Sequence, residues 1–278
     1  MSYSIKILRE LKLKPACNIE LSFTCDEESG GIDGTGYLVN QKLIKPDYAL
    51  VMDGNDRIAN AHKGVLALEI TVIGKSCHAA WPQRGINAFI GGCKLSEKLN
   101  ELNQKLSKIK SKCNTRETIE KSPTLVLGGV VKGGSKFNTL PGEFSFTIDR
   151  RIIPEENIKD AKKQIEEIID KFKKTNPEYG IKIKTLLEAE PAFTDENSKI
   201  SKILFNSIKN IKGHKPEFSL LPGFLDMRFF INDAKIPCVS YSVSGNNAHG
   251  DDEFVYISTI FENIRILCSV ILDKELGL

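Results

Sequence analysis

The hydrophobic residues of this 278-residue chain change their spacing several times along the sequence. Apolar side chains at every second position predict strands, and a period near 3.6 predicts amphipathic helices. The predicted strands cover residues 19–25, 66–72, 143–151 and 238–243. The predicted helices cover residues 87–106, 158–176, 200–211 and 257–271. A chain that mixes the two patterns in this way is predicted to belong to the α/β class.

The middle of the chain is organised differently from its two ends. Residues 64–182 read strand–helix–strand–strand–helix, which predicts a small antiparallel sheet with two helices on one face. Residues 1–63 and 183–278 place strands before polar, glycine-rich loops. In an open α/β sheet such loops lie at the carboxyl ends of strands, where binding sites form. We therefore expect an α/β domain made of 1–63 and 183–278, interrupted by an α+β domain over 64–182.

Composition excludes several classes of partner. The chain has 39 basic and 36 acidic residues, so its net charge of +3 gives no electrostatic basis for binding nucleic acid or an anionic membrane. Its apolar runs are far shorter than a bilayer span, and no secretory signal is recognised. The seven cysteines form no C-x-x-C pair. We therefore expect a cytoplasmic protein with reduced thiols, without a zinc knuckle or a disulfide framework.

The stretch SFTCDEESGG places three acids, Asp26, Glu27 and Glu28, after a predicted strand and before two glycines. Adjacent carboxylates repel one another, so they need a cation, a proton or solvent. A bound metal ion would use one carboxylate as a ligand and leave its neighbour to take a proton from a metal-bound water. The alternative is a solvated turn, which explains an isolated acidic triplet better.

Two further candidate ligands also follow predicted strands. Asp53 comes at the end of the apolar run YALVM and precedes a glycine, although an Asp–Gly turn explains that position better when it is taken alone. His249 lies in VSGNNAHGDDE, between glycine-flanked asparagines and three acids. A neutral imidazole is a common zinc ligand that a nearby acid can orient. The alternative for a single loop histidine is a surface residue.

Three candidates lie in the middle of the chain. His78 occurs in GKSCHAAWPQRGINAF, where a turn containing proline leads into a helix cap. Asn138 lies on a glycine-rich loop and offers a donor to a developing oxyanion, and Arg151 offers a two-pronged donor to a carboxylate. The alternatives are a structural strand–loop–helix connection for His78, and a loop followed by a salt-bridged strand for the other two.

The order and spacing of these motifs together resemble those of a known family. It is the zinc-dependent amidohydrolase and exopeptidase family that contains acetylornithine deacetylase, succinyl-diaminopimelate desuccinylase, aminoacylase and glutamate carboxypeptidase. The resemblance runs from near residue 4 to the last predicted helix. The motifs that carry it are TCDEESGG, ALVMDGN, HKGVLALEITVIGKSCHAAWPQRGINAF, NTLPGEFSFTIDRRIIPEE, FLDMRFF and AHGDDEFV. It implies an α/β catalytic domain with two metal ions and an inserted lid domain through which the protein forms a homodimer.

The resemblance also implies roles for the acidic and histidine residues of the flanking segments. Glu27 corresponds to the general base, and Glu28 and His249 correspond to two ligands of one zinc ion. Asp53 corresponds to a ligand of the other zinc ion. The resemblance leaves cobalt or manganese open as substitutes for zinc.

In the lid, the resemblance implies two kinds of role. His78 corresponds to a histidine that reaches the partner subunit's site and stabilises the tetrahedral intermediate. Asn138 and Arg151 correspond to substrate-binding groups, and the arginine grips the substrate carboxylate. We choose Arg151 over Arg150 because it stands two residues after Asp149, in the family's D-x-R pattern.

The sequence departs from the family in one respect. Family members carry an N-terminal segment with an H-x-D motif, whose histidine ligates one metal and whose aspartate bridges both. No such motif precedes the acidic triplet in this sequence, so we expect a truncated catalytic domain whose sheet has an exposed edge. A separate chain that supplies the segment, oligomerisation or a rearrangement would cover that edge.

Three readings of function follow. The first is a metal-dependent hydrolase of amide bonds in N-acyl amino acids or peptides with a free carboxylate, incomplete as this chain alone. The second is a non-catalytic relic that binds carboxylates or dimerises. The third is a fragment of an ordinary enzyme of the family.

Overall fold

The structure, a computed structural model, describes residues 1–277, which form two compact units. The inserted unit consists of Lys63–Lys112 and Glu117–Pro191. The flanking unit consists of Met1–His62, Cys113–Arg116 and the residues from Ala192 onward. The sequence placed the second boundary after residue 182, whereas the inserted unit continues to Pro191.

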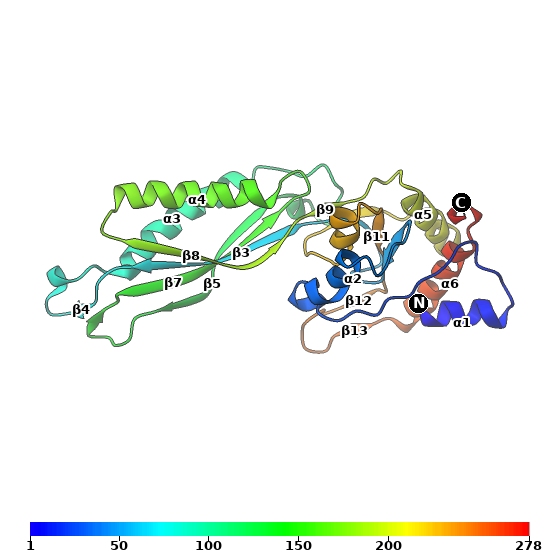
Figure 1. The fold of residues 1–278 in the computed structure, drawn as a ribbon, viewed down its shortest axis with the longest axis horizontal. Coiled ribbons are helices and arrows are strands. Elements are labelled where there is room, and N and C mark those ends of the chain that lie inside the picture. The colour runs from blue at the N-terminus through cyan, green and yellow to red at the C-terminus, as the bar shows by residue number, and fades with distance from the viewer. Residues whose placement is uncertain (278) are drawn as a thin grey trace. The chain divides into compact units, whose positions relative to one another are not determined.

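The inserted unit contains a four-stranded antiparallel sheet in the order β5-β7-β3-β8 (Figure 1). Its strands are β3 (Gly64–Ile73), β5 (Thr124–Gly133), β7 (Glu143–Ile152) and β8 (Gly180–Ala189). Its long helices are α3 (Ala88–Leu106) and α4 (Ile158–Thr175). The predicted cap of α3 is confirmed, because the Asn87 side chain accepts hydrogen bonds from the amides of Phe89 and Ile90.

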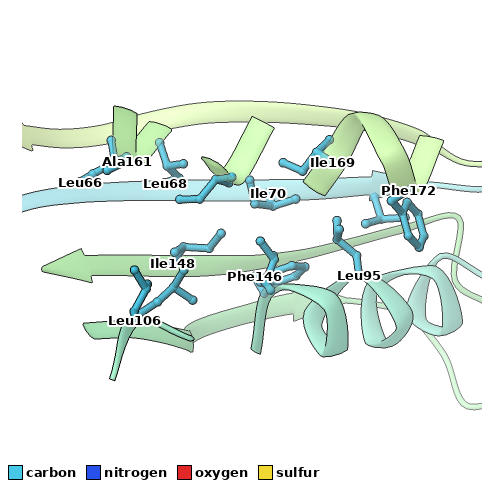
Figure 2. Packing of buried hydrophobic residues seen from close by; sticks show 14 of the residues in the cluster. Leu66, Leu68, Ile70, Leu95, Leu106, Phe146, Ile148, Ala161, Ile169 and Phe172 are labelled. Carbon is cyan, nitrogen blue, oxygen red and sulfur yellow. The ribbon is translucent and has the colours of Figure 1, made fainter. Parts of the chain in front are cut away.

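Both helices cover the same face of this sheet. Leu66, Leu68 and Ile70 of β3 are fully buried, whereas the intervening residues are half-buried, so β3 turns one set of side chains toward the helices. Figure 2 shows these side chains packed with Leu95 of α3 and Ile169 of α4. The antiparallel sheet with two helices on one face agrees with the sequence prediction.

A small ladder lies beyond the main sheet of the inserted unit. β4 (Cys77–His78) pairs with β6 (Thr139–Leu140), with Cys77 opposite Leu140 and His78 opposite Thr139. Two short 3₁₀ helices, Pro82–Arg84 and Thr118–Lys121, complete the unit.

The sheet of the flanking unit runs β1-β11-β2-β10, and β9 also pairs with β2. Its strands are β1 (Ala49–Val51), β2 (Ile58–His62), β9 (Ala192–Phe193), β10 (Phe218–Leu221) and β11 (Cys238–Ser240). The β1–β11 and β2–β10 pairs are parallel, whereas β2 is antiparallel to β11 and β9. A separate hairpin joins β12 (Gly245–Asn246) to β13 (Phe254–Val255).

Helices cover both faces of this sheet. Leu50, Ile58 and Val239 point to a core shared with α5 (Lys199–Lys212) and α6 (Ile257–Leu272). The neighbouring residues Ala49, Ala59 and Cys238 point to the opposite core. That core contains α2 (Tyr37–Asn40) and the short helix Phe229–Asp233. The helix α1 (Ser2–Glu10) contacts α6, and a last turn, Lys274–Leu276, follows α6.

The strand predicted over residues 19–25 is not formed. The segment has no regular secondary structure, and Phe23 is 78% exposed. Period-two spacing specifies an extended backbone, but a strand also needs a neighbour to accept its hydrogen bonds. The nearby strand β1 lies at the edge of the sheet and pairs only with β11 among the described strands.

Candidate functional site

The acidic triplet lies on a tight turn of the flanking unit. Asp26 has a left-handed backbone conformation (φ +74°), and Glu27–Ser29 form one turn of 3₁₀ helix. The Asp33 amide donates a 2.9 Å hydrogen bond to the Asp26 carboxylate. Asp26 therefore stabilises the loop, while Glu27 and Glu28 remain outside these hydrogen bonds.

Two residues that follow β10 hold this turn. The Thr35 hydroxyl donates a 2.6 Å hydrogen bond to Oδ2 of Asp226, which is only 5% exposed. The Arg228 guanidinium donates a hydrogen bond to the Gly30 carbonyl. Gly31 is required between them, because a Cβ on Gly31 would lie 1.9 Å from Oδ1 of Asp226. The sequence reasoning assigned no role to Asp226 or Arg228, although two charged residues inside the apolar run FLDMRFF were a visible signal.

A cavity of about 570 Å³ lies beside the turn and is lined by Glu27, Asp53 and Asp226, together with apolar residues of β1. Asp53 follows β1 directly, and its carbonyl accepts a hydrogen bond from the Ser240 hydroxyl at the end of β11. Because β1 and β11 are parallel, their carboxyl ends meet at the same edge of the sheet. Asp53 and Glu27 line the same cavity, so Asp53 lies near the acidic turn.

The carboxylates in this cavity influence one another. Burial, followed by the charges of Asp53, Asp226 and Glu28, raises the pKa of Glu27 to about 7, while His249 opposes the shift. Burial also raises the pKa of Asp226, and the Thr35 hydrogen bond and Arg228 partly offset that effect. A carboxyl group with a pKa near 7 is suited to accept and release a proton at neutral pH.

His249 lies in the loop of the β12–β13 hairpin, close to the acidic turn. Its Nε2 atom is 3.9 Å from Oε2 of Glu28, and both side chains are exposed. The structure therefore gathers Glu27, Glu28, Asp53 and His249 in one region of the flanking unit. Their roles stay predictions.

The arrangement does not by itself fit a zinc ion. Catalytic zinc sites use three protein ligands and structural sites use four. Residues 1–277 contain no group of three or more metal-binding side chains, and the Glu28–His249 pair provides two. Asp53 would need further ligands to hold a second ion.

The inserted unit brings two of its three predicted residues together. His78 lies opposite Thr139 in the β4–β6 ladder, and the Ala79 amide donates a 2.9 Å hydrogen bond to the Asn138 carbonyl. His78 and Asn138 are therefore neighbours at one end of this unit.

Arg151 is not close to them. It lies near the far end of β7, roughly 25 Å along the strand from its start at Glu143. Its guanidinium binds Asp149 through two hydrogen bonds of 2.7 and 3.0 Å. The adjacent Arg150 is fully buried and pairs with Glu156 at 2.6 Å, so Arg151 is the more accessible of the two arginines.

Comparison with known proteins identifies the inserted unit. Residues 60–177 match the family model of the peptidase dimerisation domain of M20 type. This segment is an M20 dimerisation domain. The match covers both long helices and three of the four main-sheet strands of the M20 dimerisation domain, and it ends before β8.

Relatives extend over nearly the whole chain. A metallohydrolase of Methanocaldococcus jannaschii is 26% identical over 96% of this chain and 68% of its own length. The succinyl-diaminopimelate desuccinylase of Pelagibacter ubique is 27% identical over 91% of this chain and 65% of its own length. The chain thus spans about two thirds of these relatives.

Solved structures show the same fold. A tripeptidase from Staphylococcus aureus superposes with a TM-score of 0.78 at 20% identity, covering 98% of this chain and 68% of its own. An M20 family metallo-carboxypeptidase from Sulfolobus solfataricus superposes with a TM-score of 0.73 at 18% identity, covering 98% and 74%. The predicted family resemblance and the α/β fold with an M20 dimerisation domain are confirmed. No helix within residues 1–277 has both the length and the apolar character needed to cross a bilayer.

Proposed function

We propose that this protein is a hydrolase of amide bonds in small N-acyl amino acids or peptides that carry a free carboxylate. One observation carries the proposal: Glu27 lines a cavity with Asp53 and Asp226, and its pKa is raised to about 7. The relatives named desuccinylase, tripeptidase and metallo-carboxypeptidase support the class of reaction.

Glu27 acts as the general base in this proposal. An ordinary glutamate is a weak base at neutral pH because it holds a proton poorly. The partial burial of Glu27, followed by the charges of the neighbouring carboxylates, raises its pKa and so strengthens its hold on a proton. Glu27 can then accept a proton from the attacking water and return it to the leaving amine.

Zinc is the metal that we propose for this site, with cobalt or manganese as substitutes. Glu28 and His249 would hold one ion, and Asp53 would hold the other. Because these residues do not form a three-ligand group, we propose that additional ligands come from another chain or from another part of a longer protein. The chain alone is then expected to turn over slowly or not at all.

The inserted unit would bind substrate and a second copy of the chain. His78 would stabilise the tetrahedral intermediate, Asn138 would bind the substrate, and Arg151 would grip its carboxylate after exchanging its contact with Asp149. For the homodimer we propose the β5 edge, which pairs only with β7 among the described strands. This edge exposes three valines, Val126, Val130 and Val131.

The test is hydrolysis of a panel of N-acetyl amino acids, N-succinyl amino acids and dipeptides. The chain is assayed with zinc, cobalt or manganese, alone and mixed with the segment of the M. jannaschii relative that it does not match. We expect activity in the mixture, its loss in Glu27→Gln, and no change in Glu10→Gln, whose exposed side chain lies on α1. Equal activity of Glu27→Gln and the unaltered chain would refute the role of Glu27.

A second candidate is a non-catalytic protein that dimerises and binds carboxylates. The absence of a three-ligand metal group in residues 1–277 favours it. Calorimetric titration separates the two proposals. Stoichiometric zinc binding by the mixture supports the hydrolase, and a dimer without zinc binding in any mixture supports the second candidate.

A further inference from the structure

The turn that follows β4 holds the His78 imidazole in a defined way. The Ala80 amide lies 3.1 Å from Nδ1 of His78, and the Trp81 amide donates a 2.9 Å hydrogen bond to the His78 carbonyl. The same turn is fixed to the neighbouring loop through the bond from the Ala79 amide to Asn138. The backbone around His78 is therefore bonded at three successive residues.

The contact with Ala80 specifies the position of the imidazole proton. A backbone amide can only donate a hydrogen bond, so Nδ1 must be the unprotonated, accepting nitrogen. In the neutral imidazole the proton then lies on Nε2. Rotating the ring by half a turn would place a C–H group against the amide and lose the bond, so the amide also fixes the ring orientation.

An aromatic contact fixes the plane of the ring. The centroids of the His78 and Trp81 rings are 5.4 Å apart, with an interplanar angle of 53°. The Arg84 guanidinium lies over the Trp81 ring, 5.2 Å from its centroid. His78, Trp81 and Arg84 therefore form a continuous series of contacts along one exposed turn.

We propose that Trp81 is a positioning residue and that the turn His78–Arg84 presents Nε2–H of His78 as a hydrogen-bond donor. The ligand of this donor would be the carbonyl oxygen of an amide substrate, a part of the inference that rests on the proposed function. A neutral donor suits an oxygen that gains negative charge during attack on the carbonyl carbon. Trp81 would act through His78 and would not touch the reacting atoms.

The tautomer can be measured without any enzymatic activity. Long-range ¹H–¹⁵N correlation spectra of the uniformly labelled chain at alkaline pH report which imidazole nitrogen carries the proton, and His78→Gln assigns the signal. We expect His78 to hold its proton on Nε2. The exposed His214 is the contrast in the same spectrum, because its Nδ1 lies 3.4 Å from the Lys215 carbonyl, which can only accept a hydrogen bond and so favours a proton on Nδ1. A His78 signal with the proton on Nδ1, or divided between both nitrogens, would overturn the proposal.

Two variants test the role of Trp81. Trp81→Leu removes the aromatic contact, and Trp81→Phe retains a ring as the conservative control. We expect ¹⁵N relaxation to show increased motion of the His78 ring in Trp81→Leu but not in Trp81→Phe. A well-dispersed backbone spectrum shows that Trp81→Leu is folded. If the variant is folded and the motion of the His78 ring is unchanged, Trp81 does not position His78.

Kinetics of the active mixture separate this proposal from the proposed function. If Trp81 positions a group that acts in the transition state, Trp81→Leu lowers kcat roughly three- to tenfold with little change in KM, and Trp81→Phe restores it. A rise in KM alone would refute positioning. The expected tautomer and the expected ring motion, together with no hydrolysis in any mixture, would refute the proposed function. The positioning of His78 by Trp81 would then stand.

Discussion

The hydroxyl of Thr35 donates a 2.6 Å hydrogen bond to the carboxylate of Asp226, and so joins two residues 191 positions apart in the sequence. This bond attaches the acidic turn to the loop that follows β10. It is buried, and no hydrogen-bond partner is seen for the other carboxylate oxygen of Asp226 within the described residues. The geometry of the turn therefore depends on this contact.

Replacing Thr35 by valine should destabilise the flanking unit. Thr35→Val keeps the shape of the side chain but leaves Oδ2 of Asp226 buried without its donor, at a cost of about 1.5–3 kcal/mol in free energy of unfolding. Thr35→Ser retains the hydroxyl and is the matched control. Urea denaturation of the three proteins measures the difference, and equal stability of the valine and serine variants would contradict the assignment.

Adding a methyl group at Gly31 should disrupt the turn. Gly31 has φ +69°, and a Cβ there would meet Asp226, whereas Gly213 has nearly the same φ (+74°) and open space. Both alanine variants must adopt the unfavourable left-handed backbone conformation. The difference between their losses of unfolding free energy therefore isolates the steric contact with Asp226. We expect Gly31→Ala to lose about 1–3 kcal/mol more than Gly213→Ala in chemical denaturation. A smaller loss in Gly31→Ala would show that Asp226 moves aside freely.

The raised pKa of Glu27 predicts a pH-dependent stability. Its pKa rises from 4.5 to about 7 in the folded protein, so the folded state holds this proton more tightly than the unfolded state. Glu27 therefore costs no stability below its ordinary pKa. The cost grows as the pH rises between the two values, and it is complete above the folded pKa.

The matching variant is Glu27→Gln, which remains neutral. In metal-free buffer we expect Glu27→Gln to melt at a higher temperature than the unaltered chain at pH values above the folded pKa, with the gap closing in acid. Melting curves across the acidic and neutral range provide the measurement. A gap that is independent of pH would mean that the substitution acts through packing instead.

Breaking the buried ion pair of the inserted unit should be costly. Arg150 is 0% exposed and lies 2.6 Å from Glu156. Arg150→Met leaves Glu156 without its cationic partner and is expected to cost about 3–5 kcal/mol in free energy of unfolding. Lys98→Met breaks a pair of similar length, 2.8 Å, between exposed side chains, and little change is expected there. Thermal and urea unfolding of both variants measure the two losses of stability. Equal losses would show that burial of the ion pair does not determine its contribution.

A charge on the β5 edge should separate the proposed homodimer. Val131 of β5 is 54% exposed, and Leu186 of β8, on the opposite edge of the same sheet, is 46% exposed. We expect Val131→Lys to sediment as a monomer at concentrations where the unaltered chain is a dimer, whereas Leu186→Lys remains dimeric. Dimerisation retained by the first variant and lost by the second would place the interface on β8.

Local patterns predicted the helices well because their signal is contained in a short stretch of sequence. The Asn87 cap and the apolar spacing of α4 needed no information from the rest of the chain. The segment 19–25 failed for the opposite reason, since a strand depends on a partner that spacing cannot specify. The domain boundary was placed too early because β8 is an edge strand whose exposed side chains blur its alternation.

The candidate site likewise contains residues that local sequence predicted and residues that it did not. The sequence motifs selected Glu27, Glu28, Asp53 and His249 as candidates, and the structure gathers them in one region of the flanking unit. Asp53 directly follows β1, whereas no regular strand precedes the acidic turn, and the roles of all four stay predictions. Asp226 and Arg228 were missed because their partners lie almost two hundred positions away. Only the folded chain reveals that a buried acid supports the turn.

From the antiparallel pairing of β3 with β8 we expect the inserted unit to fold before the flanking unit. Val65 lies opposite Ala189, and just beyond them His62 of β2 lies opposite Ala192 of β9. Closing the intervening segment in a disordered chain would cost on the order of 4 kcal/mol of chain entropy. Once the inserted unit has folded, its own sheet holds those two ends together. The flanking sheet can then nucleate from a pre-joined pair of strands, so mutations in the insert should slow refolding of the unit that carries the acidic turn.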